Sequence, residues 1–382
     1  MKFIHTADLH LVSPDKPEGA HRLEVLRELC ALARGKDALV IAGDLFDSAA
    51  EAAPLESALR GLFAEIRPTQ VLIIPGNHDT LRGDSPFDGR FDFGQGGNVK
   101  LFTKTPFELH TVRNTEFYGF PFARSKTSFE LTRGLEAKTT RRARVGMMHG
   151  LAADRPQLAA FALDASNREE GGESVLRDAD LRGAAFNYTA LGHIHRQEVW
   201  ELSETCAIAY AGSPDPVRIT ETGPRRALAV DLDEETGAAA ISAVELKSAG
   251  RALTREFFIF PGEEERLPQN LRDFLSSCGP DAKAAALISG LGDAAKAAQI
   301  RSEALAEWRP RFPLGLDIRV QLEQAPSENG DMALYGFMRR MQERAAQAKE
   351  PHQLELERRI LATGWRALLG MKIDPEDLLE RK

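Results

Sequence analysis

The chain has 382 residues, 43% hydrophobic and 28% charged, a balance that fits a globular protein of two or three domains and excludes a disordered or fibrous one. No hydrophobic run approaches the roughly 20 residues of a transmembrane helix, and Asp8 interrupts the N-terminal segment where a secretory signal would be hydrophobic, so we expect neither. The net charge of −8 weakens, without excluding, a nucleic-acid partner, because DNA-binding proteins usually carry a basic face.

Two further compositional features bear on partners and compartment. Small basic clusters occur at Arg141, Arg142 and Arg144 and at Arg225 and Arg226, and a solvated surface explains them as well as a nucleic-acid contact does. The three cysteines are odd in number and far apart in the sequence. We therefore expect reduced thiols and a cytoplasmic protein.

The first 225 residues repeat one pattern, in which a short hydrophobic run is followed at once by Gly, Asp, Asn or His. Such β-rich runs between breakers predict buried strands. They are Lys2–His5, Ala38–Ala42, Val71–Pro75, Arg144–Met148 and Tyr188–Leu191. Helical periodicity over Glu18–Arg34 and Pro54–Ile66 separates the early strands, which indicates an α/β domain.

Two predicted strands, Arg226–Asp233 and Ala238–Leu246, complete a first domain over residues 1–248. A small βαβαβ domain follows over 251–325. Its predicted elements are strand Glu256–Phe260, helix Leu267–Cys278, strand Ala284–Ser289, helix Ala297–Trp308 and strand Leu316–Glu323. Residues 326–330 resemble a linker, and two amphipathic helices are predicted within 331–382. Their hydrophobic faces carry Leu334, Met338, Met341 and Ala345, and then Ile360, Leu361, Trp365, Leu368 and Leu369.

Side chains of metal-binding type follow all five of the early predicted strands. They are Asp8 and His10, Asp44 and Asp47, Asn77 with His78 and Asp79, His149, and His193 with His195. Ligands bind beyond the carboxyl ends of strands in α/β sheets, so these segments are expected to converge. Residues two apart in an extended segment point the same way, and the two oxygens of Asp44 could bridge two ions. Two ions about 3.5–4 Å apart can clamp a phosphate and activate a water.

Taken one at a time, these residues have ordinary structural explanations. A lone histidine such as His149 is usually hydrogen-bonded structure, and Asp8, Asp47 and Asn77 are common cap or turn residues. Their joint order after successive strands favours the metal site. Three aspartates between residues 80 and 98 lack the alternate spacing of an EF-hand calcium loop, so we expect a flexible loop near the site mouth.

The ordered set Asp-x-His, Gly-Asp-x-x-Asp, Gly-Asn-His-Asp, His and Gly-His-x-His resembles the calcineurin-like metallophosphoesterases over roughly the first 215 residues. Within that family, the SbcD- and YhaO-like DNA repair nucleases are the group that this chain resembles in three segments, Met1–Leu11, Gly43–Asp47 and Tyr210–Pro214. The resemblance implies an α/β fold: a sandwich of two mixed sheets flanked by helices, with a small α+β capping domain and a helical C-terminal tail.

The resemblance also implies site roles. Asp8, His10, Asp44 and His195 would hold one metal ion, and Asp44, Asn77, His149 and His193 the other. His78 would donate a proton or hydrogen bond to the scissile phosphate, and Asp47 would orient it, while Asp79 is given no role. Mn²⁺ is implied, although mixed imidazole and carboxylate ligands suit iron or zinc too.

The implied function is a Mn²⁺-dependent DNA exonuclease and endonuclease of DNA repair. An SbcC-like coiled-coil ATPase would bind the C-terminal helices, and a homodimer stays open. The alternative for those helices is packing on their own core. The alternative enzyme is a stand-alone phosphodiesterase or phosphatase on nucleotides or other small phosphate esters. A non-catalytic scaffold is disfavoured by the complete ligand set and by His78.

Overall fold

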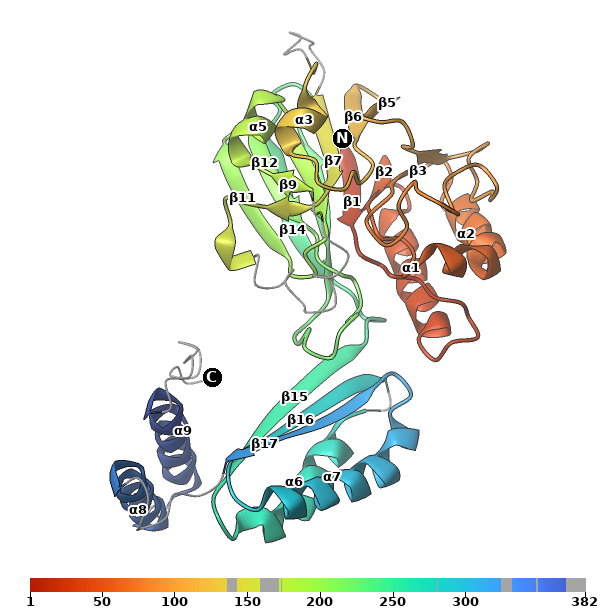
Figure 1. Ribbon diagram of the computed structural model, residues 1–382. Helices are drawn as coiled ribbons and strands as arrows, with labels where there is room; N and C mark the ends of the chain where they lie inside the picture. The colour runs from red at the N-terminus through yellow and green to blue at the C-terminus, as the bar shows by residue number, and fades with distance from the viewer. Residues whose placement is uncertain are drawn as a thin grey trace. The chain divides into compact units, whose positions relative to one another are not determined.

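Figure 1 shows the computed structural model, which describes residues 1–135, 143–158, 172, 174–279, 281–323, 332–347 and 350–368. The chain forms two compact units, Met1–Ala252 and Leu253–Lys382. The three-part division at 1–248, 251–325 and 331–382 stays a prediction, and its linker lies outside the described residues. None of the described helices is long and apolar enough to cross a bilayer.

The first sheet of unit one carries the N-terminal strands. Its order is β14 (Ala239–Glu245), β13 (Arg226–Leu232), β1 (Lys2–Thr6), β2 (Ala38–Ala42), β3 (Gln70–Ile74) and β4 (Val99–Leu101). Strands β1 to β4 are parallel, and β13 pairs antiparallel with both β1 and β14. The parallel run brings the carboxyl ends of β1, β2 and β3 to one edge of the sheet.

The second sheet contains the other two strands that precede candidate ligands. Its order is β11 (Glu198–Ser203), β12 (Cys206–Tyr210), β10 (Tyr188–Gly192), β7 (Ala143–His149), β6 (Thr115–Gly119) and β5 (Glu108–Val112). Strands β6, β7, β10 and β12 are parallel, with antiparallel β5 and β11 at the edges. The hydrophobic runs in the sequence predict only β7 and β10 of this sheet.

The two sheets pack face to face. Phe3 of β1 meets Phe117 of β6 and Tyr188 of β10 in one buried cluster, with ring centroids 5.9 and 5.5 Å apart. Full burial of each such side chain contributes roughly 1.5–3 kcal/mol. Helices α1 (Gly19–Ala33) and α2 (Ala52–Glu65) cover the outer face of the first sheet, and α3 (Ser128–Thr132) and α5 (Asp178–Gly183) pack on the second (Figure 1). The expected two-sheet sandwich is confirmed.

Unit two is a three-stranded sheet with helices. Strands β15 (Arg251–Ile259), β16 (Ala282–Leu291) and β17 (Leu316–Glu323) lie in that order, and α6 (Leu267–Ser277) and α7 (Ala294–Trp308) cover one face (Figure 1). The strands and helices share one core of hydrophobic side chains, as expected where helices cover one face of a sheet. The order of the elements is the predicted βαβαβ.

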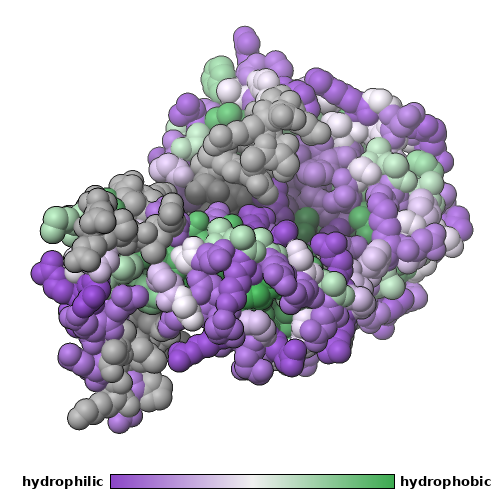
Figure 2. All heavy atoms as spheres, turned by 60° about the horizontal axis from the view of Figure 1, so that its bottom comes forward, coloured by the Kyte–Doolittle hydropathy of each residue, from purple (hydrophilic) through white to green (hydrophobic). Residues whose placement is uncertain are grey.

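The last two helices, α8 (Met332–Gln347) and α9 (Pro351–Leu368), belong to the same unit. Leu361 of α9 is buried in a cluster with Phe260, and Trp365 of α9 is buried in a cluster with Leu291 of β16. Ile360 and Leu368 are instead 40% and 51% exposed. The helices therefore use part of their hydrophobic surface on their own unit, and part remains open. On the face shown in Figure 2 the described surface is largely hydrophilic.

Candidate metal centre

The loops after β1, β2, β3, β7 and β10 meet at one rim of unit one. Backbone hydrogen bonds tie them together, since Asp8 N donates to Gly43 O at 3.1 Å and Gly150 N donates to Gly192 O at 3.2 Å. The two sheets are joined by His193 N, which donates to Asp8 Oδ1 at 2.9 Å. The predicted convergence of the five segments is what the structure shows.

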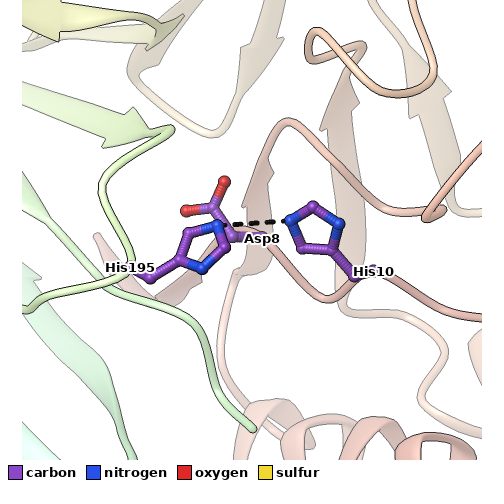
Figure 3. Close-up of side chains that lie close together, drawn as sticks. All are labelled: Asp8, His10 and His195. Carbon is purple, nitrogen blue, oxygen red and sulfur yellow. Dashed lines mark hydrogen bonds between the residues drawn. The ribbon is translucent and has the colours of Figure 1, made fainter. Parts of the chain in front are cut away.

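One half of the site is formed by Asp8, His10 and His195, whose side chains face one another in Figure 3. The Nε2 atoms of His10 and His195 lie 3.3 Å apart, although these residues are separated by 185 positions in the chain. Ligand atoms of the three residues lie within 4.8 Å of one another. This half could hold one cation.

The other half contains Asn77, His149 and His193. Asn77 Oδ1 lies 2.8 Å from His149 Nε2 and 3.1 Å from His193 Nδ1. Asp44 joins the two halves, because its Oδ2 lies 3.4 Å from His149 Nε2 and 3.7 Å from His10 Nε2. A carboxylate between two groups of ligands is well placed to bridge two ions.

The side chains fit divalent cations. Two ligand atoms that are each about 2.0–2.2 Å from a cation are themselves about 3.0–3.6 Å apart, which is close to the separations found here. The orientation of His149 also suits a metal, because its Nδ1 lies 3.0 Å from Ala42 O and can donate to it, so that Nε2, once it gives up its proton, can coordinate a cation. Imidazole, carboxylate and amide ligands suit manganese, iron or zinc.

Buried charges make this rim attract cations. Burial alone would lower the pKa of His149, but the charge of Asp44, a hydrogen bond to it and the charge of Asp8 outweigh that effect and raise the pKa to about 9. The pKa of His195 is raised as well, since Glu221 and Asp8 overcome its burial. Burial works against ionisation of Asp44, yet the neighbouring histidines hold its pKa well below the usual range.

Strained backbone holds several of these side chains in place. Asp8, His10, Asp44 and His193 have φ angles of 54°, 46°, 49° and 100°, a region that residues with a Cβ rarely adopt. Such conformations persist where the surroundings impose them, commonly at functional sites. At Gly76 an added Cβ would overlap Asp44 Oδ1, so only glycine allows the third loop to approach the bridging carboxylate.

His78 and Asp47 are brought together differently from the prediction. His78 Nδ1 donates to the backbone carbonyl of Asp47 at 3.0 Å, while the Asp47 carboxylate lies 3.3 Å from His10 Nδ1. Asp47 therefore holds His78 through its main chain and a predicted ligand through its side chain. His78 also belongs to a group, with His10 and Asp44, that could hold a cation.

Asp79, to which the motif resemblance assigns no role, joins two loops. Its Oδ1 accepts from Gly76 N at 2.7 Å and its Oδ2 from Phe46 N at 3.0 Å. Burial, reinforced by the charge of Asp44, raises the pKa of Asp79 to about 7. This side chain fixes the Asp44 loop against the Asn77 loop and so sets the spacing of the site.

Other sequence expectations are corrected. Arg144 is buried and donates to Tyr118 Oη at 3.0 Å, and the Arg225 side chain is only 9% exposed beside Glu221, so neither belongs to a solvated basic surface. Arg141 and Arg142 lie outside the described residues. The loop after Asp79 is anchored, because Phe87 and Phe93 enter the core of unit one.

Sequence reasoning missed Glu221. Its Oε1 lies 2.6 Å from His195 Nδ1, on the side of the imidazole opposite His10. No motif marks this glutamate, which follows its histidine by 26 residues, so only the fold could reveal the contact.

Comparisons with known proteins agree with this geometry. The family model for calcineurin-like phosphoesterases matches residues 1–197. The uncharacterized metallophosphoesterase YhaO of Bacillus subtilis is 29% identical over 247 residues, covering 59% of this chain and 56% of YhaO. The SbcD component of the nuclease SbcCD, from the same organism, is 27% identical over 291 residues, covering 67% of this chain and 72% of SbcD.

A purple acid phosphatase from yellow lupin is a distant structural match, with a TM-score of 0.36 and 11% identity over 66% of this chain and 52% of the phosphatase. The family match spans more than half of the chain and all five loops of the rim. The chain belongs to the calcineurin-like phosphoesterase family, whose members hydrolyse phosphoesters with two divalent metal ions.

Proposed function

We propose that this chain is a Mn²⁺-dependent DNA exonuclease and endonuclease that acts in DNA repair with an SbcC-like ATPase. The observation that carries the proposal is the similarity to the SbcD component of the nuclease SbcCD, which covers two thirds of this chain and so extends beyond the residues that the family model matches. The similarity to YhaO spans little more than half of that relative and specifies no substrate.

In this proposal the predicted ligand sets keep their roles. Asp8, His10, Asp44 and His195 hold one ion, and Asp44, Asn77, His149 and His193 hold the other. The bound ions would polarise the phosphodiester and lower the pKa of a water nucleophile. Asp44 sits between the two sets and fixes their separation.

His78 supplies the proton. Because its Nδ1 is engaged by the Asp47 carbonyl, its Nε2 is the nitrogen that can donate to the leaving oxygen. It lies beside the rim, since its backbone N donates to Asp44 Oδ1 at 2.9 Å. Asp47 therefore acts as a positioning residue for the acid.

Degradation of linear duplex DNA tests the substrate. The purified chain, alone and with the ATPase, is incubated with 5′- and 3′-labelled duplex and with a small phosphodiester such as bis-p-nitrophenyl phosphate, with Mn²⁺ or with EDTA. We expect metal-dependent cleavage of both substrates. Cleavage of the small ester alone, even with the ATPase present, would contradict the nuclease proposal.

The partner surface that we propose lies on α9. Leu356 and Ile360 are four residues apart and 42% and 40% exposed, with Leu368 also open near the helix end. Exposed hydrophobic side chains in one helical stripe suit a coiled-coil partner. Replacing Leu356 and Ile360 with serine should abolish co-purification with the ATPase and leave small-ester hydrolysis intact. Unchanged co-purification would remove this surface from the proposal.

The second candidate is a stand-alone enzyme that hydrolyses nucleotides or other small phosphate esters. The net charge of −8 favours it, because an acidic chain repels a DNA backbone. The two candidates differ in salt dependence: DNA cleavage through phosphate contacts should weaken steeply with added salt, whereas hydrolysis of a small ester should change little.

A further inference from the structure

The imidazoles of the rim differ in what stands behind them. The Nε2 atoms of His10 and His195 face each other, and each Nδ1 lies beside a carboxylate. That carboxylate is Glu221 for His195 and Asp47 for His10. His149 Nδ1 instead contacts the neutral carbonyl of Ala42 at 3.0 Å, and the nearest carboxylate oxygen, Asp8 Oδ1, is farther away at 3.9 Å. The two halves of the site are therefore unequal in their surroundings as well as in their ligands.

Glu221 is held rigidly for its contact with His195. Its Oε2 accepts from Val217 N at 2.9 Å and from Ser213 Oγ at 3.1 Å, which leaves Oε1 directed at the imidazole. Arg225 lies 3.7 Å from the same Oε2 and donates to His195 O and Ser213 Oγ. Because the carboxylate is already fixed in this way, little further conformational entropy is lost when it supports a metal ligand.

Charge adds to the asymmetry. In the proposed ligand sets, the ligands assigned to one half alone are Asp8, His10 and His195 on one side, and Asn77, His149 and His193 on the other, although Asp8 Oδ1 also lies 3.9 Å from His149 Nδ1. The first set includes an anion and the second a neutral amide. Asp79 positions the loops of Asp44 and Asn77, but its two oxygens accept backbone amides, and so they hold the main chain and no imidazole.

We propose that Glu221 is a positioning residue that, together with Asp47, makes the Asp8–His10–His195 half bind its divalent cation more tightly than the Asn77–His149–His193 half. A carboxylate behind a metal-binding imidazole fixes the ring and increases its strength as a ligand. The first half consequently fills at lower metal concentration than the second. This inference rests on the metal roles given under Proposed function.

Titration calorimetry of the EDTA-treated full chain with Mn²⁺ tests the inequality without an activity assay. We expect two binding events with dissociation constants that differ tenfold or more. Asn77→Ala should weaken only the weaker event. Two events of equal affinity would overturn the inference and leave the proposed function intact, whereas no binding at all would overturn the metal centre itself.

Glu221→Gln tests the positioning role. It keeps the shape of the side chain and should weaken the tighter event by about 10–100-fold while the weaker event stays unchanged. Glu221→Asp, which restores the charge on a shorter side chain, should recover part of the loss. The electron paramagnetic resonance spectrum at one equivalent of Mn²⁺ should show a single mononuclear species in the wild type and a mixture in Glu221→Gln.

The matched control is Asp215→Asn, a carboxylate in the same segment that bonds to His21 and Gly250 N and touches none of the proposed ligands. It should leave both events unchanged. Equal weakening of both events by Glu221→Gln, or no weakening, would contradict the positioning role. If Glu221→Gln fails to fold, the wild-type and Asn77→Ala titrations still decide whether the halves are unequal.

Discussion

The two units of the chain place their buried polar groups differently. In unit one Asp8, His10, Asp44 and His149 are almost fully buried and face one another. In unit two a buried carboxylate such as Glu264 accepts hydrogen bonds from backbone amides of neighbouring turns. Burial of charged groups is costly unless they are paired. In unit one the buried carboxylates are paired with imidazoles, which bind protons or a metal ion, whereas in unit two Glu264 is satisfied by backbone amides alone.

Backbone conformation differs in the same way. Within the described residues, every non-glycine residue with a positive φ angle lies in unit one, and four of them are at the rim. All three groups of side chains that could hold a metal ion, among the residues that the structure places, lie there too. Function is concentrated where strain and buried charge coincide, while unit two consists of regular packed elements.

The largest expected effect comes from the bridging carboxylate. Asp44→Asn removes a charge shared by both halves, and we expect hydrolysis to fall about 10⁴-fold, because metal ions contribute several kcal/mol to catalysis and each 1.4 kcal/mol is a factor of about ten. Steady-state hydrolysis of a small phosphodiester measures it. An Asp44→Asn enzyme with near wild-type activity would mean that the strained rim is not the catalytic region.

A smaller loss is expected for the proton donor. His78→Gln should reduce turnover about 10²–10⁴-fold, the usual contribution of an acid catalyst, while the protein keeps both metal ions. Metal analysis beside the kinetic assay separates the two roles. Loss of an ion together with activity would identify His78 as a ligand, an outcome that its position near His10 and Asp44 makes worth measuring.

Much of this site could be predicted from the sequence because its parts are local. Each loop places Asp, Asn or His directly after a hydrophobic strand, so the motif order predicts the convergence. The sequence predicts that Asp47 orients His78, and in the structure its carbonyl contacts His78 while its carboxylate lies beside His10, since the direction of a side chain at a turn depends on packing. Glu221 could not be found, because its contact joins residues 26 positions apart that no pattern connects.

The fold can likewise be predicted only in part, because only some of its strands have a local sequence pattern. The buried parallel strands stand out as hydrophobic runs between breakers. Strand β11 alternates half-buried and exposed side chains at the edge of the second sheet, and it therefore lacks such a run. Arg225 is misassigned from the sequence, because two adjacent arginines predict a solvent-exposed surface. Its burial becomes clear only from the structure, in which Glu221 lies beside it.

A stability effect should follow from the residue that joins two loops. Asp79→Ala leaves Gly76 N and Phe46 N without their acceptor, and each unsatisfied buried amide costs about 1–3 kcal/mol, so we expect a loss of about 2–6 kcal/mol. Chemical denaturation measures it. Asp79→Asn retains one carbonyl acceptor and should lose less; equal losses would show that the carboxylate is not the link.

A further stability effect concerns pH in the metal-free protein. The pKa of His149 is about 9 in the folded chain and ordinarily 6.5, so the folded state binds that proton more tightly. Its stabilisation is complete below pH 6.5 and is lost as pH rises through 9, on the order of 3 kcal/mol. The Tm of EDTA-treated protein should fall across this range. A flat profile, or one matched by His149→Gln, would contradict the assigned charge balance.

The most direct test of the two-ion rim is the anomalous scattering of manganese in crystals grown with Mn²⁺. We predict two peaks on the rim of unit one, one among Asp8, His10, Asp44 and His195 and one among Asp44, Asn77, His149 and His193. Crystals that show no peak among these side chains would contradict the metal centre.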